Sequence, residues 1–107
     1  MKLLTKAIVE RFAKVGGQDK PDAIVICKFF DPCGSWSWFA TEYDPVDRIF
    51  FGLVQGFETE LGSFSLDELE SYRGRMGLGI ERDLYWKEQT LEEVRAKIER
   101  LDAAVRV

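Results

Sequence analysis

The chain has 107 residues, 46% of them hydrophobic and 13% aromatic, which is enough apolar material for one packed domain. It contains no histidine, and this excludes the Ser/His and Cys/His nucleophile systems and the usual histidine-ligated zinc sites. No run approaches the roughly 18 consecutive apolar residues of a membrane span, and charged residues interrupt the N-terminal segment. We therefore expect a cytoplasmic protein with no signal peptide and no membrane partner.

The net charge of −4 is unevenly distributed along the chain. Residues 29–70 carry nine acidic side chains and one basic side chain, while the flanking segments are near neutral or slightly basic. Like-charge repulsion makes such a block a poor surface for phosphate, so direct nucleic-acid binding is not expected. A basic protein partner or a bound cation would instead be attracted.

A helix is predicted near 5–14, with Thr5 as its N-cap. Its apolar side chains recur at helical spacing: Leu4, Ile8, Phe12 and Val15. Two glycines end this helix, and a polar loop is expected at 18–22. The apolar, β-branched run at 23–30 then predicts a strand that is buried on much of both faces.

Three further strands are predicted at 36–43, 48–55 and 57–64. The segment 44–47 has the composition of a turn, so the first two of these strands form a hairpin around it. The third strand is more polar, as is typical of a sheet edge. Strict alternation divides the side chains of the first strand between two faces: Trp36, Trp38, Ala40 and Glu42 against Ser37, Phe39, Thr41 and Tyr43.

The C-terminal part combines two helices with an irregular segment. Capping-box patterns at Ser65–Glu68 and Thr90–Glu93 predict helices at 66–72 and 91–103. In the first, the Glu68 side chain is expected to return to the Ser65 N–H. Between them, three glycines make 73–79 irregular and flexible, and a short strand is expected at 80–86. The last helix carries an apolar stripe: Leu91, Val94, Ile98 and Leu101.

These elements predict an α+β fold for a single domain, 1–107. Its core is an antiparallel sheet of about four to five strands, formed by 23–64 and the short strand near 80–86. The N-terminal helix, the short helix near 66–72 and the C-terminal helix near 91–103 are expected to pack against this sheet.

Five carboxylates of the hairpin and the following strand form the first candidate site: Glu42, Asp44, Asp47, Glu58 and Glu60. Several neighbouring oxygens can bind a hard cation such as Mg²⁺ or Ca²⁺, and a facing pair such as Glu42 and Glu58 is suited to acid/base catalysis. However, the spacing matches no compact metal signature, and solvated acidic residues on turns and an edge strand explain the same pattern. No cofactor, metal site or catalytic residue is therefore assigned.

Aromatic side chains are concentrated in the same strands, and most of them are expected in the core. Both faces of the hairpin are apolar. Helices can cover one of them, whereas residues 72–86 or a partner must cover the other. An exposed Trp36 or Trp38 would then mark a binding patch.

Two cysteines and a glycine-bearing segment are further candidates. Cys27 alternates with apolar strand residues and is expected in the core, whereas Cys33 lies in a Pro/Gly loop where a thiol is more exposed. The segment 73–79, RGRMGLG, combines glycines with two arginines. It lacks the ending of a P-loop and the flanking elements of a dinucleotide site, so a flexible connection and an anion-contacting loop both stay open.

Three segments together resemble a bacterial family of small domains of unknown function: LLTKAIVERF, WSWFATEYDPVDRIFFGLVQGFETELGSFSLDELE and GLGIERDLYW. The resemblance covers about residues 3–95. It implies a gene carried on plasmids, conjugative elements or phages, with neighbours in DNA metabolism or anti-restriction. It implies no catalytic residue.

The favoured hypothesis is a non-enzymatic accessory protein of mobile genetic elements that binds a protein partner. An acidic, aromatic-flanked sheet surface would compete with DNA for a basic site, as in anti-restriction or anti-CRISPR defence. The residues expected to bind are Glu42, Asp44, Glu58, Glu60, Trp36 and Trp38. One alternative is a small carboxylate- or metal-dependent enzyme that acts at the same face. Another is a structural homodimer whose third strand pairs edge to edge.

Overall fold

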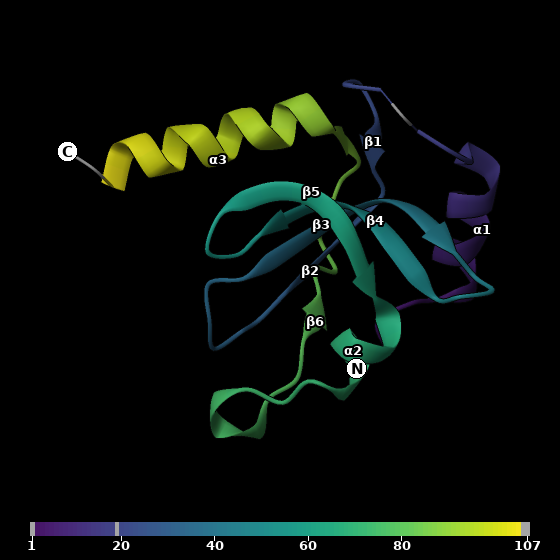
Figure 1. Ribbon diagram of the computed structural model, residues 1–107, viewed down its shortest axis with the longest axis horizontal. Coiled ribbons are helices and arrows are strands. Elements are labelled where there is room, and N and C mark those ends of the chain that lie inside the picture. The colour runs from purple at the N-terminus through teal and green to yellow at the C-terminus, as the bar shows by residue number, and fades with distance from the viewer. Residues whose placement is uncertain (1, 19, 106–107) are drawn as a thin grey trace.

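The computed structural model describes residues 2–18 and 20–105, so Asp19, in the loop expected at 18–22, lies outside the described residues. The described residues form three α-helices, a five-stranded antiparallel sheet and a separate two-stranded sheet. The α+β prediction is therefore confirmed. In Figure 1, helix α3 lies on one side of the strands and helix α2 on the other. Within the same ranges, no helix is long and apolar enough to cross a membrane.

The large sheet has the strand order β5-β4-β3-β2-β6. Its bounds in chain order are β2 Cys27–Phe30, β3 Ser37–Asp44, β4 Ile49–Gln55, β5 Thr59–Ser65 and β6 Glu81–Arg82. The β3–β4 hairpin turns at the expected segment, where Asp44 Oδ1 accepts a hydrogen bond from the backbone N–H of Val46 at 2.9 Å. β5 is an edge strand, as predicted from its polar composition.

The strand predicted at 23–30 is divided in two, because the chain changes partners at Ile26. β1, Ile24–Val25, leaves the large sheet and pairs with β7, Gln89–Thr90, in the two-stranded sheet. The Ile26 N–H still donates to Ala40 O at 2.9 Å, which connects the two sheets. The expectation of one continuous strand is wrong here, and the sequence reading missed β7.

Buried Gln18 supports this division, since its side-chain amide forms hydrogen bonds with three backbone groups of β1 and β3. Its Nε2 donates to the carbonyl oxygens of Ile24 and Thr41 at 3.0 and 2.7 Å, and its Oε1 accepts from the Ile24 N–H at 2.7 Å. A buried backbone group without a partner costs about 1–3 kcal/mol. The residue expected in a polar loop therefore holds the two sheets together.

The strand predicted at 80–86 is reduced to the two residues of β6. The cause is Asp83, whose backbone N–H still donates to Lys28 O at 2.9 Å while its Oδ1 accepts from the Tyr85 N–H at 3.0 Å. This side-chain-to-backbone bond is typical of a turn. The chain therefore leaves the sheet at Asp83 instead of continuing to Trp86.

A β-bulge in β3 changes which side chains share a face. The pairing with β4 shifts between Ala40 and Glu42, so Thr41 is the extra residue. Tyr43 thereby joins Trp38 on one face, and Glu42 moves to the other. The strict alternation predicted for this strand is wrong after Ala40, because one inserted residue reverses the faces of all that follow.

Gly52 of β4 lies beside this bulge, where the two backbones come unusually close. A Cβ at Gly52 would lie 1.9 Å from the carbonyl oxygen of Phe39. At Gly62, which pairs with Gly52 across β4 and β5, a Cβ would meet nothing within 4 Å. The bulge therefore requires glycine in β4 but not at the paired position of β5.

The three helices begin where the capping patterns predict. α1 is Lys6–Val15, α2 is Leu66–Ser71 and α3 is Leu91–Val105, and a single 3₁₀ turn, η1, spans Arg75–Gly77. The hydroxyls of Thr5, Ser65 and Thr90 accept from the backbone N–H three residues on, at 3.2 Å in each case. Glu93 completes the second box, because its Oε1 accepts from the Thr90 N–H at 3.0 Å.

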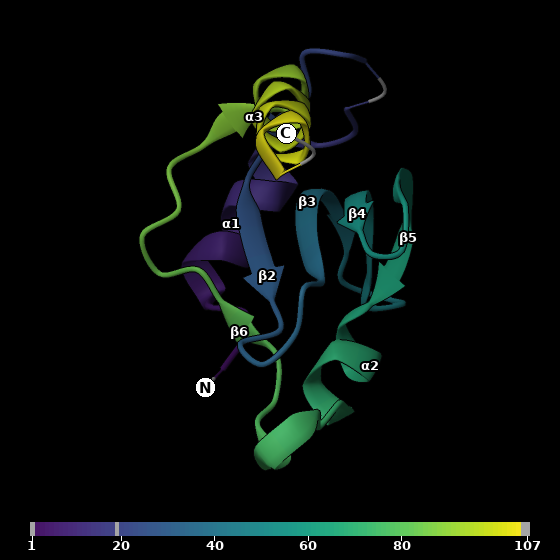
Figure 2. The same ribbon diagram turned by 90° about the vertical axis from the view of Figure 1, so that its left-hand side faces the viewer.

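Each face of the large sheet carries its own apolar cluster. The α1/α2 face contains Phe29, Phe50 and Phe64 together with Phe12 of α1 and Leu69 of α2. The α3 face contains Phe39 and Leu53 together with Leu91, Val94 and Ile98. Figure 2 shows α3 end-on across the strands from α2. The stripe predicted on α3 is thus buried, except for Leu101, which is 66% exposed.

Candidate functional site

A groove of about 420 Å³ opens on the α1/α2 face, between β3 and α2. We name it the tryptophan groove, and its lining residues are Asp31, Trp36, Trp38, Phe64, Ser65, Glu68, Leu69, Tyr72 and Ile80. Two of these, Trp36 and Trp38, were expected to bind, and both are half-buried. The other seven come from the β2–β3 loop, the end of β5, α2 and the segment after it.

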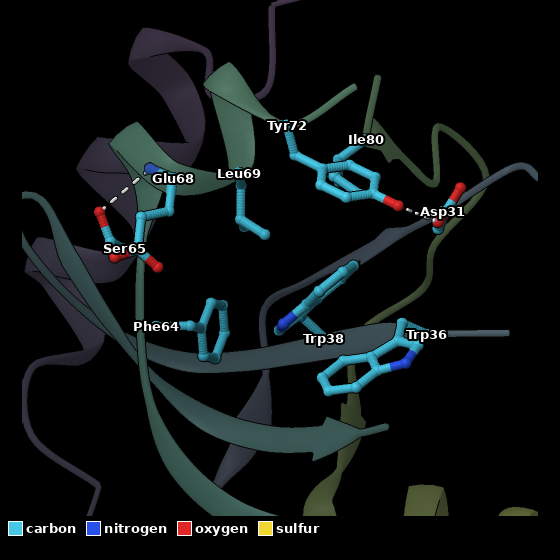
Figure 3. Close-up of a pocket in the computed structure, with 9 residues that line it drawn as sticks. All are labelled: Asp31, Trp36, Trp38, Phe64, Ser65, Glu68, Leu69, Tyr72 and Ile80. Carbon is cyan, nitrogen blue, oxygen red and sulfur yellow. Dashed lines mark hydrogen bonds between the residues drawn. The ribbon is translucent and has the colours of Figure 1, made fainter. Parts of the chain in front are cut away.

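The groove has aromatic and aliphatic walls. In Figure 3, Trp36 and Trp38 form one side and Tyr72 and Leu69 the other, with Phe64 beside Trp38. The two indole rings are 6.0 Å apart between centroids and tilted by 37°. Such rings present large, rigid contact areas, and tryptophan and tyrosine are enriched in protein-binding hot spots.

Trp36 is held in place from behind by the β4–β5 turn. Its ring covers Gly56 so closely that a Cβ there would lie 2.5 Å from the indole. Phe57 adds an edge-on contact at 5.3 Å between ring centroids, although its own side chain is 95% exposed. The Trp36 ring is therefore held in one position, and the exposed side chain of Phe57 beside it is available for contact with a partner.

The indole N–H groups of the groove are free, unlike that of the third tryptophan. Trp86 Nε1 donates to Val25 O at 2.9 Å. Within residues 2–18 and 20–105, no such partner exists for Nε1 of Trp36 or of Trp38. The groove consequently offers two unused hydrogen-bond donors on otherwise apolar walls.

Two carboxylates lie at opposite ends of the groove. Figure 3 shows Asp31 near the Tyr72 hydroxyl and Glu68 at the far end beside Phe64. Tyr72 Oη donates to Asp31 Oδ2 at 3.2 Å, and the negative charge of Asp31 raises the pKa of Tyr72. Asp31 Oδ1 also accepts from the Cys33 N–H at 3.0 Å. Asp31 is thus fixed by neutral donors, and its charge is not compensated.

The negative charge of Glu68 also has no cationic partner in the described chain, whereas the charges of its α2 neighbours Asp67 and Glu70 are paired with Arg48. Arg48 bonds Asp67 Oδ1 and Glu70 Oε1 at 2.7 and 2.8 Å. In the described part of the chain, the Glu68 carboxylate has neither an ion pair nor a hydrogen-bond partner. The groove end of α2 therefore keeps a free negative charge.

The acidic residues singled out from the sequence do not form one cluster. Glu42 and Asp44 line a different cavity, of about 450 Å³ beside α1. Glu58 lies beyond the opposite end of β4, so Glu42 and Glu58 do not face each other. Only Glu60 shares the face of the groove, because it pairs with Val54, which in turn pairs with Trp38.

The other candidate residues have structural surroundings. Burial raises the pKa of the Cys27 thiol to about 12, so it stays protonated in the core, while Cys33 is half-buried in its loop. In the 73–79 segment, Arg73 Nη1 donates to the backbone carbonyls of Glu70 and Tyr72. Among the described residues, no group of three or more Cys, Asp or Glu is placed to hold a metal ion.

Sequence reasoning missed Asp31, Glu68 and Tyr72 as parts of the site. The capping box had already singled out Glu68, but as a helix cap that returns to Ser65. Tyr72 and Asp31 are 41 positions apart, and no local pattern joins them. We had expected helices on one face and residues 72–86 or a partner on the other, but helices cover both faces: α1 and α2 cover the groove face, and α3 covers the other.

A family model matches residues 2–103, and its description is "Protein of unknown function (DUF2958)". No curated protein matches the chain, and no solved structure does. The match spans almost the whole sequence and agrees with the resemblance to small domains of unknown function. The chain belongs to the DUF2958 family.

Proposed function

We propose that this chain is a non-enzymatic accessory protein that binds a protein partner, and that the tryptophan groove is its contact surface. The supporting observation is that Trp36 and Trp38 line an open groove with both indole N–H groups free. Tryptophans in partly desolvated pockets carry much of the binding energy of many interfaces. A tryptophan that serves only the core is expected to donate its N–H to an acceptor inside the protein, as Trp86 does.

The charge of the groove suggests the kind of partner. Asp31, Glu68 and Glu60 lie in or beside it, and no Lys or Arg is among the groove's lining residues. Complementary charge favours a basic protein surface. The family resemblance suggests a gene on mobile elements, so the proposed partner is a DNA-binding protein of anti-plasmid or anti-phage defence, whose basic site the acidic groove would occupy in place of DNA.

Affinity capture with matched variants tests this proposal. The chain would be immobilised as wild type, as the double variant Trp36→Ala/Trp38→Ala and as Trp86→Phe, and exposed to purified restriction and CRISPR effector proteins. We expect capture of an effector by the wild type and Trp86→Phe, and its loss from the double variant. Capture of an effector by the wild type and both variants, or by none of the three, would contradict the proposal.

Charge reversal separates the groove from the other acidic surface. Glu60 lies on the groove face, whereas Glu42 lines the second cavity, and each would be changed to Lys in a separate variant. We expect the first change to weaken binding and the second to leave it nearly unchanged. A larger loss of binding from Glu42→Lys than from Glu60→Lys would indicate that the contact surface is the cavity lined by Glu42 and Asp44.

A homodimer through β5 is the second candidate, because β5 pairs on one side with β4 and has no other strand neighbour among the described residues. Such an edge is a template for pairing with another chain. Light scattering of the purified protein decides it: a mass of two chains favours the dimer, and a mass of one chain excludes it as the resting state.

A further inference from the structure

We infer that the tryptophan groove receives an extended peptide segment of the partner, with a Lys or Arg side chain directed at the carboxylate of Glu68. This inference rests on the proposed function and names the chemistry that the groove selects. Three features of the groove carry it: its free donors, its dimensions and its uncompensated charge.

The free donors favour a ligand that carries hydrogen-bond acceptors. Nε1 of Trp36 and of Trp38 have no partner in the described chain, so a ligand that brings carbonyl oxygens gains hydrogen bonds without breaking any within the protein. An extended peptide exposes its backbone carbonyls because it has no internal hydrogen bonds. Aromatic grooves are a recurring binding mode for such segments.

The dimensions of the groove agree with an extended chain. The ring centroids of Trp36 and Trp38 are 6.0 Å apart. Residues two apart along an extended or polyproline II segment are separated by roughly 6 to 7 Å. A cavity of about 420 Å³ holds a few side chains of such a segment.

The charge of the groove selects a basic segment. Asp31 and Glu68 lie at opposite ends, and neither has a cationic partner in the described chain. A Lys or Arg side chain can lay its apolar stem along the indole faces and reach Glu68 with its charged end. Glu68 is the available carboxylate, because Asp31 already accepts hydrogen bonds from Tyr72 Oη and the Cys33 N–H. An acidic segment or a phosphate would meet like charge at both ends of the groove.

Selection from a random dodecapeptide phage library tests the inference on the full chain. The library would be selected on the wild type and counter-selected on Trp36→Ala/Trp38→Ala, with the thermal unfolding of each variant as a control for folding. We expect enrichment of Lys and Arg among peptides that need the two tryptophans. The most enriched peptide should bind the wild type at least tenfold more tightly than the double variant.

A pair of charge-neutral variants on α2 then tests the role of Glu68. Glu68→Gln should weaken binding of the enriched peptide about twofold to fivefold, in line with an exposed ion pair. Asp67→Asn is the matched control, because Asp67 is engaged by Arg48, and it should leave the affinity unchanged. Replacing the basic residue of the peptide with Gln should reproduce the Glu68→Gln loss.

The possible results separate the inference from the proposed function. Peptides that depend on Trp36 and Trp38 but lack basic residues, or that bind Glu68→Gln as well as the wild type, would overturn the inference and leave a protein-binding groove. Failure to enrich any peptide that depends on the tryptophans would overturn both. A folded Trp38→Phe variant replaces the double variant if the latter does not fold.

Discussion

The two faces of the large sheet use tryptophan in opposite ways. On the α3 face, Trp86 packs against Phe39 at 5.8 Å between ring centroids and donates its N–H to Val25 O. On the α1/α2 face, Trp36 and Trp38 contact each other and keep both N–H groups free. All three side chains are half-buried, so burial alone does not distinguish them.

This contrast distinguishes the candidate site better than composition does. A half-buried aromatic residue is ordinary in a small domain. A half-buried tryptophan whose polar atom is satisfied inside the protein contributes mainly to stability. A tryptophan with its polar atom free in a groove is equipped for binding, so mutations on the two faces should affect different measurements.

The largest expected effect on stability is at the centre of the α3 face. Leu53→Ala removes a fully buried side chain beneath α3 and should lower the free energy of unfolding by about 2–5 kcal/mol. Leu61→Ala is the matched control on the paired strand, because Leu61 is 45% exposed, and it should cost less than about 1 kcal/mol. Urea unfolding measures both, and equal losses would contradict the assigned burial.

Phenylalanine substitutions compare the tryptophans directly. Trp86→Phe loses the hydrogen bond to Val25 O and should lower the free energy of unfolding by about 1–3 kcal/mol. Trp38→Phe breaks no hydrogen bond and should cost less than Trp86→Phe while weakening partner binding. Thermal or urea unfolding checks the order, and a larger stability loss from Trp38→Phe would break the comparison.

Gly56→Ala should move Trp36 without removing it. The new Cβ would meet the indole ring at 2.5 Å, and the ring must shift. We expect a changed Trp36 fluorescence spectrum and weaker partner binding, with a stability loss below about 1 kcal/mol. Gly62→Ala, with nothing within 4 Å of its Cβ, is the control and should change neither. Unaltered fluorescence in Gly56→Ala would contradict the packing of Trp36 on the turn.

The smallest effect on the free energy of unfolding is expected at the surface ion pair of Arg11 and Glu88, away from the groove. Arg11 donates two hydrogen bonds to the Glu88 carboxylate, at 2.8 and 2.9 Å, and they lower the pKa of Glu88. A lowered folded-state pKa stabilises the protein above the unfolded pKa, and this contribution is lost as pH falls through the folded value.

Both side chains of that pair are 37% exposed, so solvent screening limits the effect. Glu88→Gln should reduce the free energy of unfolding by less than about 1 kcal/mol at neutral pH. The difference from wild type should shrink as the pH falls below the unfolded pKa of about 4.3 and vanish once the pH is below the lowered folded pKa of Glu88. Unfolding measured across this pH range tests it, and a difference that grows in acid would have the wrong sign.

Local rules predicted the elements of the fold but not their long-range pairing. The helix starts followed from caps such as Thr5 and Ser65, whose partners lie three residues away. The division of the 23–30 strand depends on Gln18 and on a bond from Ile26 to Ala40, which are tertiary contacts. The bulge at Thr41 likewise depends on the register of two strands and has no local signal.

The site was predicted in part for the same reason. The aromatic density of one strand drew attention to Trp36 and Trp38, and an uncovered aromatic face was expected. Asp31 and Glu68 reach the groove from the β2–β3 loop and α2, which are brought together by tertiary contacts such as the hydrogen bond from Tyr72 to Asp31. The acidic block in the sequence spread over both faces because the bulge moved Glu42 to the face opposite Trp38.

The indole N–H resonances give the most direct test of the central claim that the tryptophan groove binds a partner. The three signals would be recorded by ¹H–¹⁵N NMR before and after addition of the most enriched library peptide. We predict that Trp36 and Trp38 shift on binding while Trp86, already bonded to Val25 O, stays in place. A shift of Trp86 alone, or no change at Trp36 and Trp38 under saturating peptide, would contradict the account.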